Sequence, residues 1–367
     1  MSPIVLVLNV GSSSIKFSLF QDEQELPLIL KGKIVNLQGN ASFYAADKRV
    51  RVYEHGVTHE QALVDLLKWV ELSSYGGAIK VVGHRIVHGG AHFHSPVILN
   101  ISVLSDLEAF TPLAPLHQPF NLMAVPLIQR IDPTIQQVGC FDTAFHVHQP
   151  ALFQTYALSA HLRGLGIRKY GFHGLSYEWI TTVLRTDYPE MFHKKIIAAH
   201  LGNGASLCAL YKGKSIETTM GMSILEGMPM GTRCGSLDPG VVLYLQRHLG
   251  MGLEEIEHEL FYQSGLKGLS ELTNDMAVLL SHRSDSAKFA VEYYVTCVAQ
   301  FVAKLAVSLG GIDGLVFTGG IGENSSEIRQ RVMEKIAFLG LVKSIVIEAN
   351  EERMMAIHCQ QLIHGEG

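Results

Sequence analysis

Hydrophobic and polar positions along the chain predict two similar hairpins. Residues 4–20 (IVLVLNVGSSSIKFSLF) run from an apolar segment through a Gly-Ser turn into alternating apolar and polar side chains. This pattern is typical of a buried strand, a tight turn and a second strand. Residues 195–216 (KIIAAHLGNGASLCALYKGKSI) repeat the design with another Gly-rich turn. The repetition indicates a duplicated architecture with one hairpin in each half.

The turns of both hairpins carry chemistry that suits phosphate. The first holds Asn9, Ser12, Ser14 and Lys16, so hydroxyls, backbone N–H groups and one ammonium converge at its tip. Gly and Ser also make ordinary tight turns, which is the preferred interpretation of one isolated turn. Because the design occurs twice, we expect a phosphate-handling hairpin in each half.

The rest of the pattern alternates strands and helices. Helices are predicted at 59–72, 105–110, 121–131, 241–249, 253–262, 284–309 and 325–338 and from residue 350. Strands are predicted at 79–90, 138–146, 195–216 and 344–347. Residues 28–53 are predicted to form further short strands, with turns at Gly32 and Gly39. A strand followed by a glycine turn is predicted at 314–324, a loop or turn at 266–274, and a long Gly-rich loop at 217–240. Strands that alternate with helices indicate the α/β class.

Length and composition favour a two-domain protein without a nucleic-acid or membrane surface. The chain has 367 residues, of which 47% are hydrophobic, and a net charge of -5. No basic run suits nucleic acid or an anionic membrane. The five cysteines are scattered with no CxxC pair, which fits reduced thiols in a cytosol.

Two apolar segments bear on targeting and membrane insertion. The N-terminus enters a strand at once, so we expect no signal peptide. Residues 289–309 are interrupted by Glu292, Gln300 and Lys304, which favours a buried or interface helix over a membrane span. We therefore expect a cytoplasmic protein.

Polar residues at strand ends and in loops are the candidates for chemistry. Arg85 lies at the end of a predicted strand beside a Gly-Gly turn. Its guanidinium can there bind a carboxylate or phosphate through two parallel hydrogen bonds, or form a surface ion pair. The end of strand 138–146 is predicted to expose Asp142, Thr143 and His146, and Asp142 is either functional or a helix N-cap. A lone histidine such as His173 is more often structural. Loop 217–240, with Arg233, is too rich in glycine for ordinary core and predicts an active-site loop.

Nine motifs along the chain form a specific and ordered set: LNVGSSSIKF, GHRIVHGG, APLHQP, FDTAFH, YGFHG, HLGNGAS, MGTRCGSLDP, FTGGIGEN and NEE. Through them the sequence resembles the acetate kinase family of short-chain acid kinases over roughly residues 5–357. The resemblance implies the two-domain fold of actin, hexokinase and heat-shock chaperone ATPases, with a duplicated βββαβαβα core and the active site in the interdomain cleft. It implies an N-terminal domain of residues 1–144 plus the helix 352–367, and a nucleotide-binding domain of residues 145–351.

The resemblance also implies an activity. Members transfer the γ-phosphoryl group of ATP to acetate, reversibly and in line, giving acetyl phosphate and ADP with Mg²⁺ or Mn²⁺. The implied partners are a short-chain carboxylate and ATP, and a second copy of the chain in a homodimer, with no nucleic acid and no membrane.

Roles carried over from the family are expectations for single positions. The catalytic residues would be Asp142, Arg85, His173 and Arg233, of which His173 and Arg233 stabilise the transition state and His117 supports them. The acid would lie among Arg85, Val87, Leu116, Phe172 and Ile224. The nucleotide would contact Lys16, Ser12, Ser14, His200, Asn203, Gly204, Asp275, Gly320, Ile321, Gly322, Glu323 and Asn324. The metal would be held by Asn9 and Glu351.

The chemistry explains why such residues are needed. Moving a phosphoryl group onto a carboxylate brings two anions together, so positive charge must bridge them. A carboxylate is already nucleophilic, so positioning dominates and no strong base is required. Asp142 is therefore expected to orient the metal or an arginine rather than to take a proton.

Several positions depart from the family pattern. Ile224 replaces a proline and Ser236 an aspartate, Ala277 stands where an arginine is usual, and Lys267 replaces an apolar residue. Ile224 bears on the chain length of the acid, and the loss of an arginine at 277 removes a stacking plane over the base.

Three alternatives to an acetate kinase follow. Propionate differs from acetate by one methylene, worth only about 1–3 kcal/mol in an apolar pocket. A nucleotide-driven structural or chaperone protein would need no acid pocket, and Arg85, His173 and Arg233 together argue against it. A degraded, weakly active paralogue is the third.

Overall fold

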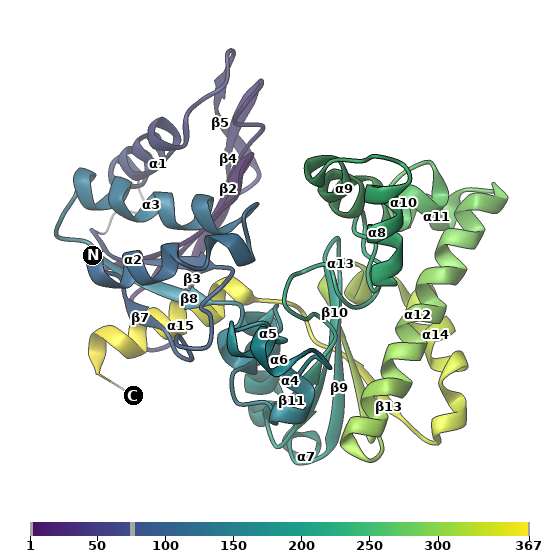
Figure 1. Ribbon diagram of the computed structural model, residues 1–367. Helices are drawn as coiled ribbons and strands as arrows, with labels where there is room; N and C mark the ends of the chain where they lie inside the picture. Colours follow the sequence, from purple (N-terminus) through teal and green to yellow (C-terminus); the bar gives the residue numbers. More distant parts are fainter. Residues whose placement is uncertain (1–2, 74–77, 366–367) are drawn as a thin grey trace. The chain divides into compact units, whose positions relative to one another are not determined.

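The computed structural model describes residues 3–73 and 78–365, which form two compact units (Figure 1). The first unit comprises Met1–Ala144 and Asn350–Gly367, and the second comprises Phe145–Ala349. That each unit folds as a separate domain, with the boundaries predicted from the sequence, stays a prediction.

The first unit consists of an eight-stranded sheet and helices. Its strands are β1 Ile4–Val10, β2 Ser14–Gln21, β3 Leu28–Val35, β4 Ala41–Ala45, β5 Lys48–Tyr53, β6 Ile79–Ile86, β7 Val97–Ile98 and β8 Gln136–Phe141. Its helices are α1 His59–Leu72, α2 Ile101–Glu108, α3 Gln118–Ile131 and α15 Glu351–His364, with a 3₁₀ turn at Thr111–Leu113.

The second unit holds a five-stranded sheet. Its strands are β9 Lys195–Leu201, β10 Ala205–Tyr211, β11 Lys214–Thr218, β12 Gly314–Thr318 and β13 Lys343–Val346. Its helices are α4 Ala151–Gln154, α5 Ala160–Gly164, α6 Gly174–Thr186, α7 Pro189–Phe192, α8 Pro239–Arg247, α9 Leu253–His258, α10 Gly265–Ser270, α11 Met276–Ser281, α12 Asp285–Leu309, α13 Gly319–Asn324 and α14 Ser326–Lys335, with a π-helical turn at Glu259–Gln263 and 3₁₀ turns at Ala144–His146, which begins in the first unit, and Ala337–Leu339.

Both sheets are built on the same plan. The first has the order β5-β4-β3-β2-β1-β6-β8-β7 and the second β11-β10-β9-β12-β13. In each, three consecutive antiparallel strands are followed by two parallel ones, so β3-β2-β1-β6-β8 corresponds to β11-β10-β9-β12-β13. The duplication predicted from the two hairpins is confirmed.

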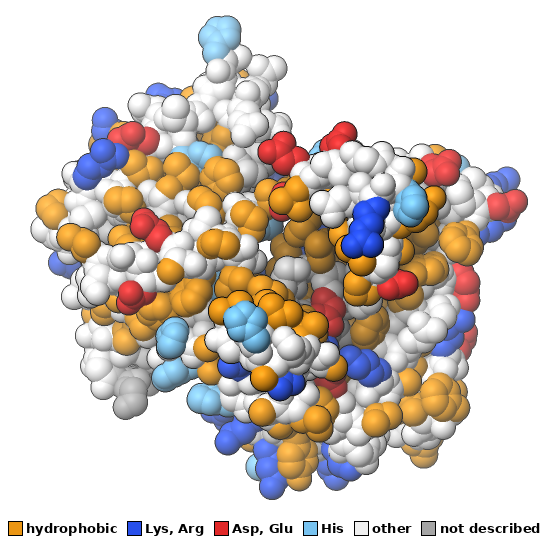
Figure 2. Space-filling view, viewed as in Figure 1, with side chains coloured by type: hydrophobic (Ala, Val, Ile, Leu, Met, Phe, Trp, Pro, Cys, Tyr) orange, Lys and Arg blue, Asp and Glu red, His pale blue; other side chains and the backbone are white. Residues whose placement is uncertain are grey.

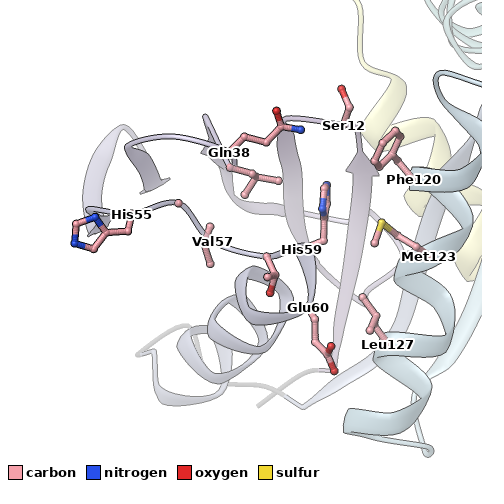
Figure 3. A pocket seen from close by; sticks show the side chains of 12 residues that line it. Ser12, Gln38, His55, Val57, His59, Glu60, Phe120, Met123 and Leu127 are labelled. Carbon is pink, nitrogen blue, oxygen red and sulfur yellow. The ribbon is translucent and has the colours of Figure 1, made fainter.

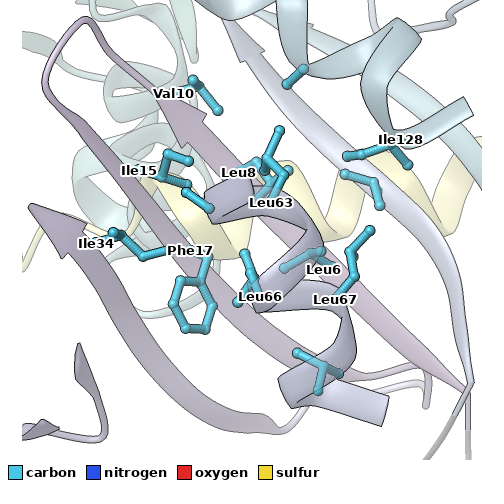
Figure 4. Packing of buried hydrophobic residues seen from close by; sticks show 14 of the residues in the cluster. Leu6, Leu8, Val10, Ile15, Phe17, Ile34, Leu63, Leu66, Leu67 and Ile128 are labelled. Atoms are coloured by element: carbon cyan, nitrogen blue, oxygen red, sulfur yellow. The ribbon is translucent and has the colours of Figure 1, made fainter. Parts of the chain in front are cut away.

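The side chains of β1, which point alternately to the two faces of the first sheet, show which helices cover each face. Leu6 and Leu8 pack with Leu63 of α1 and Ile128 of α3 in one buried cluster (Figure 4). Since successive side chains point to opposite faces, Val7 lies on the other face, against which α15 packs. The sheet is therefore covered by helices on both faces.

Helices also cover both faces of the second sheet. Tyr177 and Ile180 of α6 pack with Ile196 and Ala198 of β9, and the long helix α12 packs on β10 and β11. By length and composition alone α12 could cross a membrane, but half of its most apolar window is buried inside the unit. A core helix of a globular unit has the same properties.

Some elements differ in kind from the sequence prediction. Gly32 was predicted to make a turn but lies inside β3, where the Phe17 ring covers it so closely that a Cβ atom would come within 2.2 Å of the ring. The predicted loop 266–274 begins with helix α10. The predicted glycine turn after β12 is the helix α13, whose first N–H group, on Gly319, donates to the Glu323 carboxylate. In each case tertiary packing or a side-chain partner decides against the turn preference of glycine.

Three buried histidines make a prediction about acid stability. Burial lowers the pKa of His84, His88 and His146 to about 4, below the ordinary 6.5. Because the unfolded chain binds protons more readily at these positions, the stability they contribute is complete above about pH 6.5 and is lost as the pH falls toward 4. Urea titrations from pH 7 to 4 should show the unfolding free energy falling by up to about 3 kcal/mol for each histidine.

A variant comparison isolates that effect. His88→Leu should have a shallower dependence of unfolding free energy on pH than the parent, whereas His161→Gln, at an exposed position in α5, should keep the parental dependence. Equal slopes for His88→Leu and the parent would contradict the prediction.

Candidate active site

One group of predicted site residues forms a charge cluster in the first unit. Arg85, near the end of β6, donates from Nη2 to Asp142 Oδ2 at 2.9 Å and from Nη1 to Glu351 Oε2 at 2.7 Å. Its Nε lies 3.2 and 3.1 Å from the two Asp142 oxygens. Asp142 directly follows β8 and Glu351 begins α15, so three elements meet at this guanidinium.

Two carboxylates compete for one cation in this cluster. Burial, reinforced by the Glu351 carboxylate and opposed by Arg85, raises the pKa of Asp142 to about 6. Although burial works against it, Asp142 and Glu351 hold the pKa of Arg85 above its ordinary value. The guanidinium therefore keeps its charge, and Asp142 orients it through two oxygens.

The predicted exposure at the end of strand 138–146 is wrong. Asp142, Thr143 and His146 are all buried, because β8 ends at Phe141 and a 3₁₀ turn carries the chain inward. Thr143 Oγ1 accepts from the Gly89 N–H at 3.0 Å. Both Asp142 oxygens lie within hydrogen-bond distance of the Arg85 guanidinium, and a functional role for Asp142 stays a prediction.

The first hairpin turn lies at the same end of the sheet as this cluster. Gly11 N donates to Ser14 O across the turn, and Asn9 pairs with Lys16 in the strand register. Ser12 borders a cavity of about 630 Å³ between α1 and α3 (Figure 3). Neither Arg85 nor Asp142 lines this cavity.

In the second unit, Arg233 is a partly buried cation on the Gly-rich loop. Its Nη1 donates to Ile224 O and Met230 Sδ, each at 3.3 Å. Within residues 3–73 and 78–365 it has no carboxylate partner, and burial lowers its pKa to about 10. A partly buried guanidinium that is charged at neutral pH and lacks a carboxylate partner is suited to binding an anion.

His173 adjoins the same point. A methyl group placed on Gly204 would lie 3.3 Å from His173 Nε2 and 3.6 Å from Arg233 Nη2. The His173 ring is held by Ser206, whose Oγ is 2.8 Å from Nδ1 and 2.5 Å from the Tyr177 hydroxyl. The turn between β9 and β10 is thus flanked by one imidazole and one guanidinium.

Residues predicted to hold the nucleotide gather partly around this turn. Asn203 O accepts from Gly231 N, and the His200 ring lies 4.5 Å from that of His173. Gly320 borders open space at the start of α13, where the helix also holds Ile321, Gly322 and Asn324. Asp275 is engaged differently, since its carboxylate caps α11 through the N–H groups of Ala277 and Val278.

The residues predicted to line the acid pocket are divided between the two units. Val87 and Leu116 belong to the first unit, and Phe172 and Ile224 to the second. Val87 and Phe172 are buried, whereas Leu116 and Ile224 are partly exposed. His117 is the residue before α3 in the first unit.

Sequence reasoning missed the contacts that hold the Arg233 loop. Ser236 closes the loop on itself, since its N–H donates to Gly227 O at 2.7 Å and its Oγ accepts from Gly227 N at 3.1 Å. Glu226 accepts from the Tyr156 hydroxyl and pairs with Lys169 at 2.9 Å. Glu226 is far in sequence from Tyr156 and Lys169, so no local pattern predicts these contacts. The one available signal was Ser236, which departs from the family pattern at the position that closes the loop.

The predicted metal ligands have suitable chemistry. Asn9 offers an amide oxygen and Glu351 a carboxylate, both hard donors of the kind that Mg²⁺ prefers. In the described part of the chain no three His, Cys, Asp or Glu side chains cluster as a metal site. Mg²⁺ usually takes one or two protein oxygens beside substrate phosphates and water, so the two residues fit.

The duplicated α/β fold therefore carries a turn flanked by a guanidinium and an imidazole, an arrangement suited to a protein that handles small anions. The chain belongs to the acetokinase family, whose model matches residues 4–359. An acetate kinase of Rhodopseudomonas palustris (strain TIE-1) is 44% identical over 350 residues, covering 93% of this chain and 88% of that protein.

Two solved structures share the fold. A propionate kinase from Francisella tularensis superimposes with a TM-score of 0.92 at 34% identity, covering 98% of this chain and all (100%) of that one. The acetate kinase of Porphyromonas gingivalis gives a TM-score of 0.88 at 32% identity, covering 99% and 100%. The predicted actin/hexokinase-like fold class is confirmed.

Proposed function

We propose that the protein is an acetate kinase, an ATP-dependent phosphotransferase that forms acetyl phosphate and ADP from acetate and ATP. The observation that carries this proposal is Arg233, a partly buried guanidinium without a carboxylate partner in the described residues, beside the imidazole of His173. A transferred phosphoryl group supplies the negative charge that such a pair lacks.

The proposed roles follow from charge and position. Arg233 and His173 hold the equatorial oxygens of the phosphoryl group, and Arg85 directs the acid carboxylate. Asp142 and Glu351 orient Arg85, as their hydrogen bonds to it indicate. No residue needs to take a proton, because the acceptor is already an anion.

Nucleotide and metal complete the proposal. Asn203, Gly204 and Gly320 hold the nucleotide, with the Ser12 and Lys16 hairpin on its phosphates. Asn9 and Glu351 would hold Mg²⁺, which neutralises phosphate charge when bound. Asp275 is proposed only as the cap of α11, because its carboxylate accepts from the N–H groups of Ala277 and Val278.

A short-chain acid kinase with a preference for propionate is the second candidate. The propionate kinase from Francisella tularensis has nearly the same fold as this chain. Ile224, where the family has proline, would line the acyl end of the site.

One assay tests these functions together. The protein is incubated with ATP, Mg²⁺, hydroxylamine and acetate, propionate or butyrate, and the trapped hydroxamate is measured. We expect kcat/KM to be highest with acetate, and a higher value with propionate would assign the second candidate. If no acid gave hydroxamate while ATP was hydrolysed, a nucleotide-driven structural protein would replace the kinase.

We also propose that the protein is a cytoplasmic homodimer. Helix α8 has no buried residue, and its Tyr244 is 55% exposed; on α12, Phe289 and Val307 are 57% and 81% exposed. Figure 2 shows hydrophobic side chains reaching the surface among charged ones. A second copy would cover such residues.

Sedimentation velocity at micromolar concentration should show a species with twice the mass of the 40.4 kDa chain. Tyr244→Glu should shift the population toward monomer, whereas Lys288→Glu on an exposed charged position should not. A single monomeric species for the parent would refute the dimer.

A further inference from the structure

His173 has an unusual backbone conformation that something must maintain. Its φ of 58° and ψ of 25° place it in the left-handed region, at the N-cap of α6 and without a side-chain cap hydrogen bond. A residue with a Cβ atom adopts this conformation only where its surroundings fix it, and such residues concentrate at functional sites.

The peptide that precedes His173 is held by a buried histidine. His146 Nε2 lies 2.9 Å from Phe172 O, and Nδ1 lies 2.8 Å from Ser215 Oγ. Ser215 Oγ in turn accepts from Gln149 Nε2 at 2.7 Å. His146 therefore links β11 to the peptide bond that sets the φ of His173.

The chemistry of these partners fixes the tautomer of His146. A carbonyl oxygen only accepts, so Nε2 carries the proton and donates to Phe172 O. Nδ1 then accepts from the Ser215 hydroxyl, whose oxygen accepts from Gln149. Burial lowers the pKa of His146 to about 4, which keeps the ring neutral and this direction of donation intact at physiological pH.

The backbone at residues 170–171 lies in close contact with the His146 imidazole ring. Gly171 has a φ of +79°, and a Cβ atom there would lie 2.8 Å from the His146 ring. On the other side, the N–H groups of Tyr170 and Gly171 donate to Gly221 O at 3.0 and 3.2 Å. With Ser206 on the His173 ring, the segment is held from both the backbone and the side chain.

We propose that His146 is a positioning residue for the phosphoryl-transfer step, which holds the Phe172 carbonyl and thereby keeps His173 in the left-handed conformation that directs its ring at the β9–β10 turn. This inference rests on the proposed function for the role of His173. His146 itself touches neither substrate nor reacting atoms.

The test compares four variants of the full-length protein. His146→Leu removes the donor to Phe172 O, His146→Gln keeps an amide donor, and Ser215→Ala removes the hydroxyl that fixes the tautomer. The matched control is Ser308→Ala. It removes a hydroxyl that donates to Glu217, a buried residue of β11, the strand that also holds Ser215.

Small displacements of a catalytic group cost large factors in rate, so we expect His146→Leu to lower kcat for acyl phosphate formation by about tenfold to a hundredfold. His146→Gln and Ser215→Ala should lose less, roughly threefold to tenfold, and the KM for ATP should change by less than about twofold in all three. Ser308→Ala should keep the parental kcat even if its melting temperature falls.

A second readout needs no activity. The ring signals of His173 in ¹⁵N-histidine NMR spectra, assigned by their loss in His173→Gln, should shift in His146→Gln and Ser215→Ala but not in Ser308→Ala. If the parent made no acyl phosphate the proposed function would fail, while these spectra would still decide the positioning role. Unchanged kcat and unchanged His173 signals in the His146 and Ser215 variants, or equal losses in Ser308→Ala, would overturn the inference.

Discussion

Replacing Arg233 by alanine is expected to lower kcat for acyl phosphate formation by about 10²- to 10³-fold, the range for one preorganised charged donor. The KM for ATP should change little, because the guanidinium stabilises charge that spreads only in the transition state. Arg233→Lys should recover part of the loss, since an ammonium restores the charge but not the planar fork.

The comparison needs an arginine that is not part of the site. Arg163, exposed on α5, serves as the control, and Arg163→Ala should keep both kinetic constants. Steady-state kinetics at saturating acid and at saturating ATP separate the two constants. If Arg233→Ala raised only the KM for ATP and left kcat intact, the residue would be a nucleotide contact and its proposed role would be wrong.

Asp142→Ala is expected to lower the free energy of unfolding by about 3–5 kcal/mol. The substitution removes the bidentate partner of Arg85 and leaves that guanidinium, whose side chain is only 19% exposed, with Glu351 alone. Replacing the whole cluster, Arg85→Met with Asp142→Leu and Glu351→Gln, should recover much of this loss, because no unpaired charge then remains in it.

An exposed ion pair provides the contrast. Arg130 and Glu60 lie 3.0 Å apart with side chains 66% and 60% exposed, so Glu60→Ala should cost less than about 1 kcal/mol. Urea unfolding at pH 7 measures all four proteins. A loss below about 1 kcal/mol for Asp142→Ala would show that Asp142 and Arg85 are not coupled as described.

The elements that could be predicted from the sequence are those with a strong local pattern. The period of apolar residues gave helix α1 its correct bounds, and the repeated hairpins predicted the plan shared by the two sheets. Gly32 was wrongly predicted to form a turn, because a glycine is needed there to make room for the Phe17 ring of the neighbouring strand. A turn preference is local, whereas the ring contact is tertiary.

The site shows the same division. The resemblance named Arg85, Asp142 and Glu351 as separate candidates, but their convergence on one guanidinium joins residues separated by up to 266 positions. Neither spacing nor composition encodes such a contact. Likewise, burial of Asp142 and His146 depended on where β8 ends and how the following turn bends, which the apolar run through Phe141 did not reveal.

The position of α15 in the chain has a consequence for the order of synthesis. This helix packs on β1 and β6, brings Glu351 to Arg85, and presses Cys359 so close to Gly83 that a Cβ atom there would lie 2.7 Å from its sulfur. Residues Phe145–Ala349, the whole second unit, are translated between the first part of the first unit and α15. On the ribosome, the face of the first sheet that receives α15 therefore stays uncovered until the second unit has been synthesised, and exposed apolar surface of this kind makes a partly folded chain prone to aggregation.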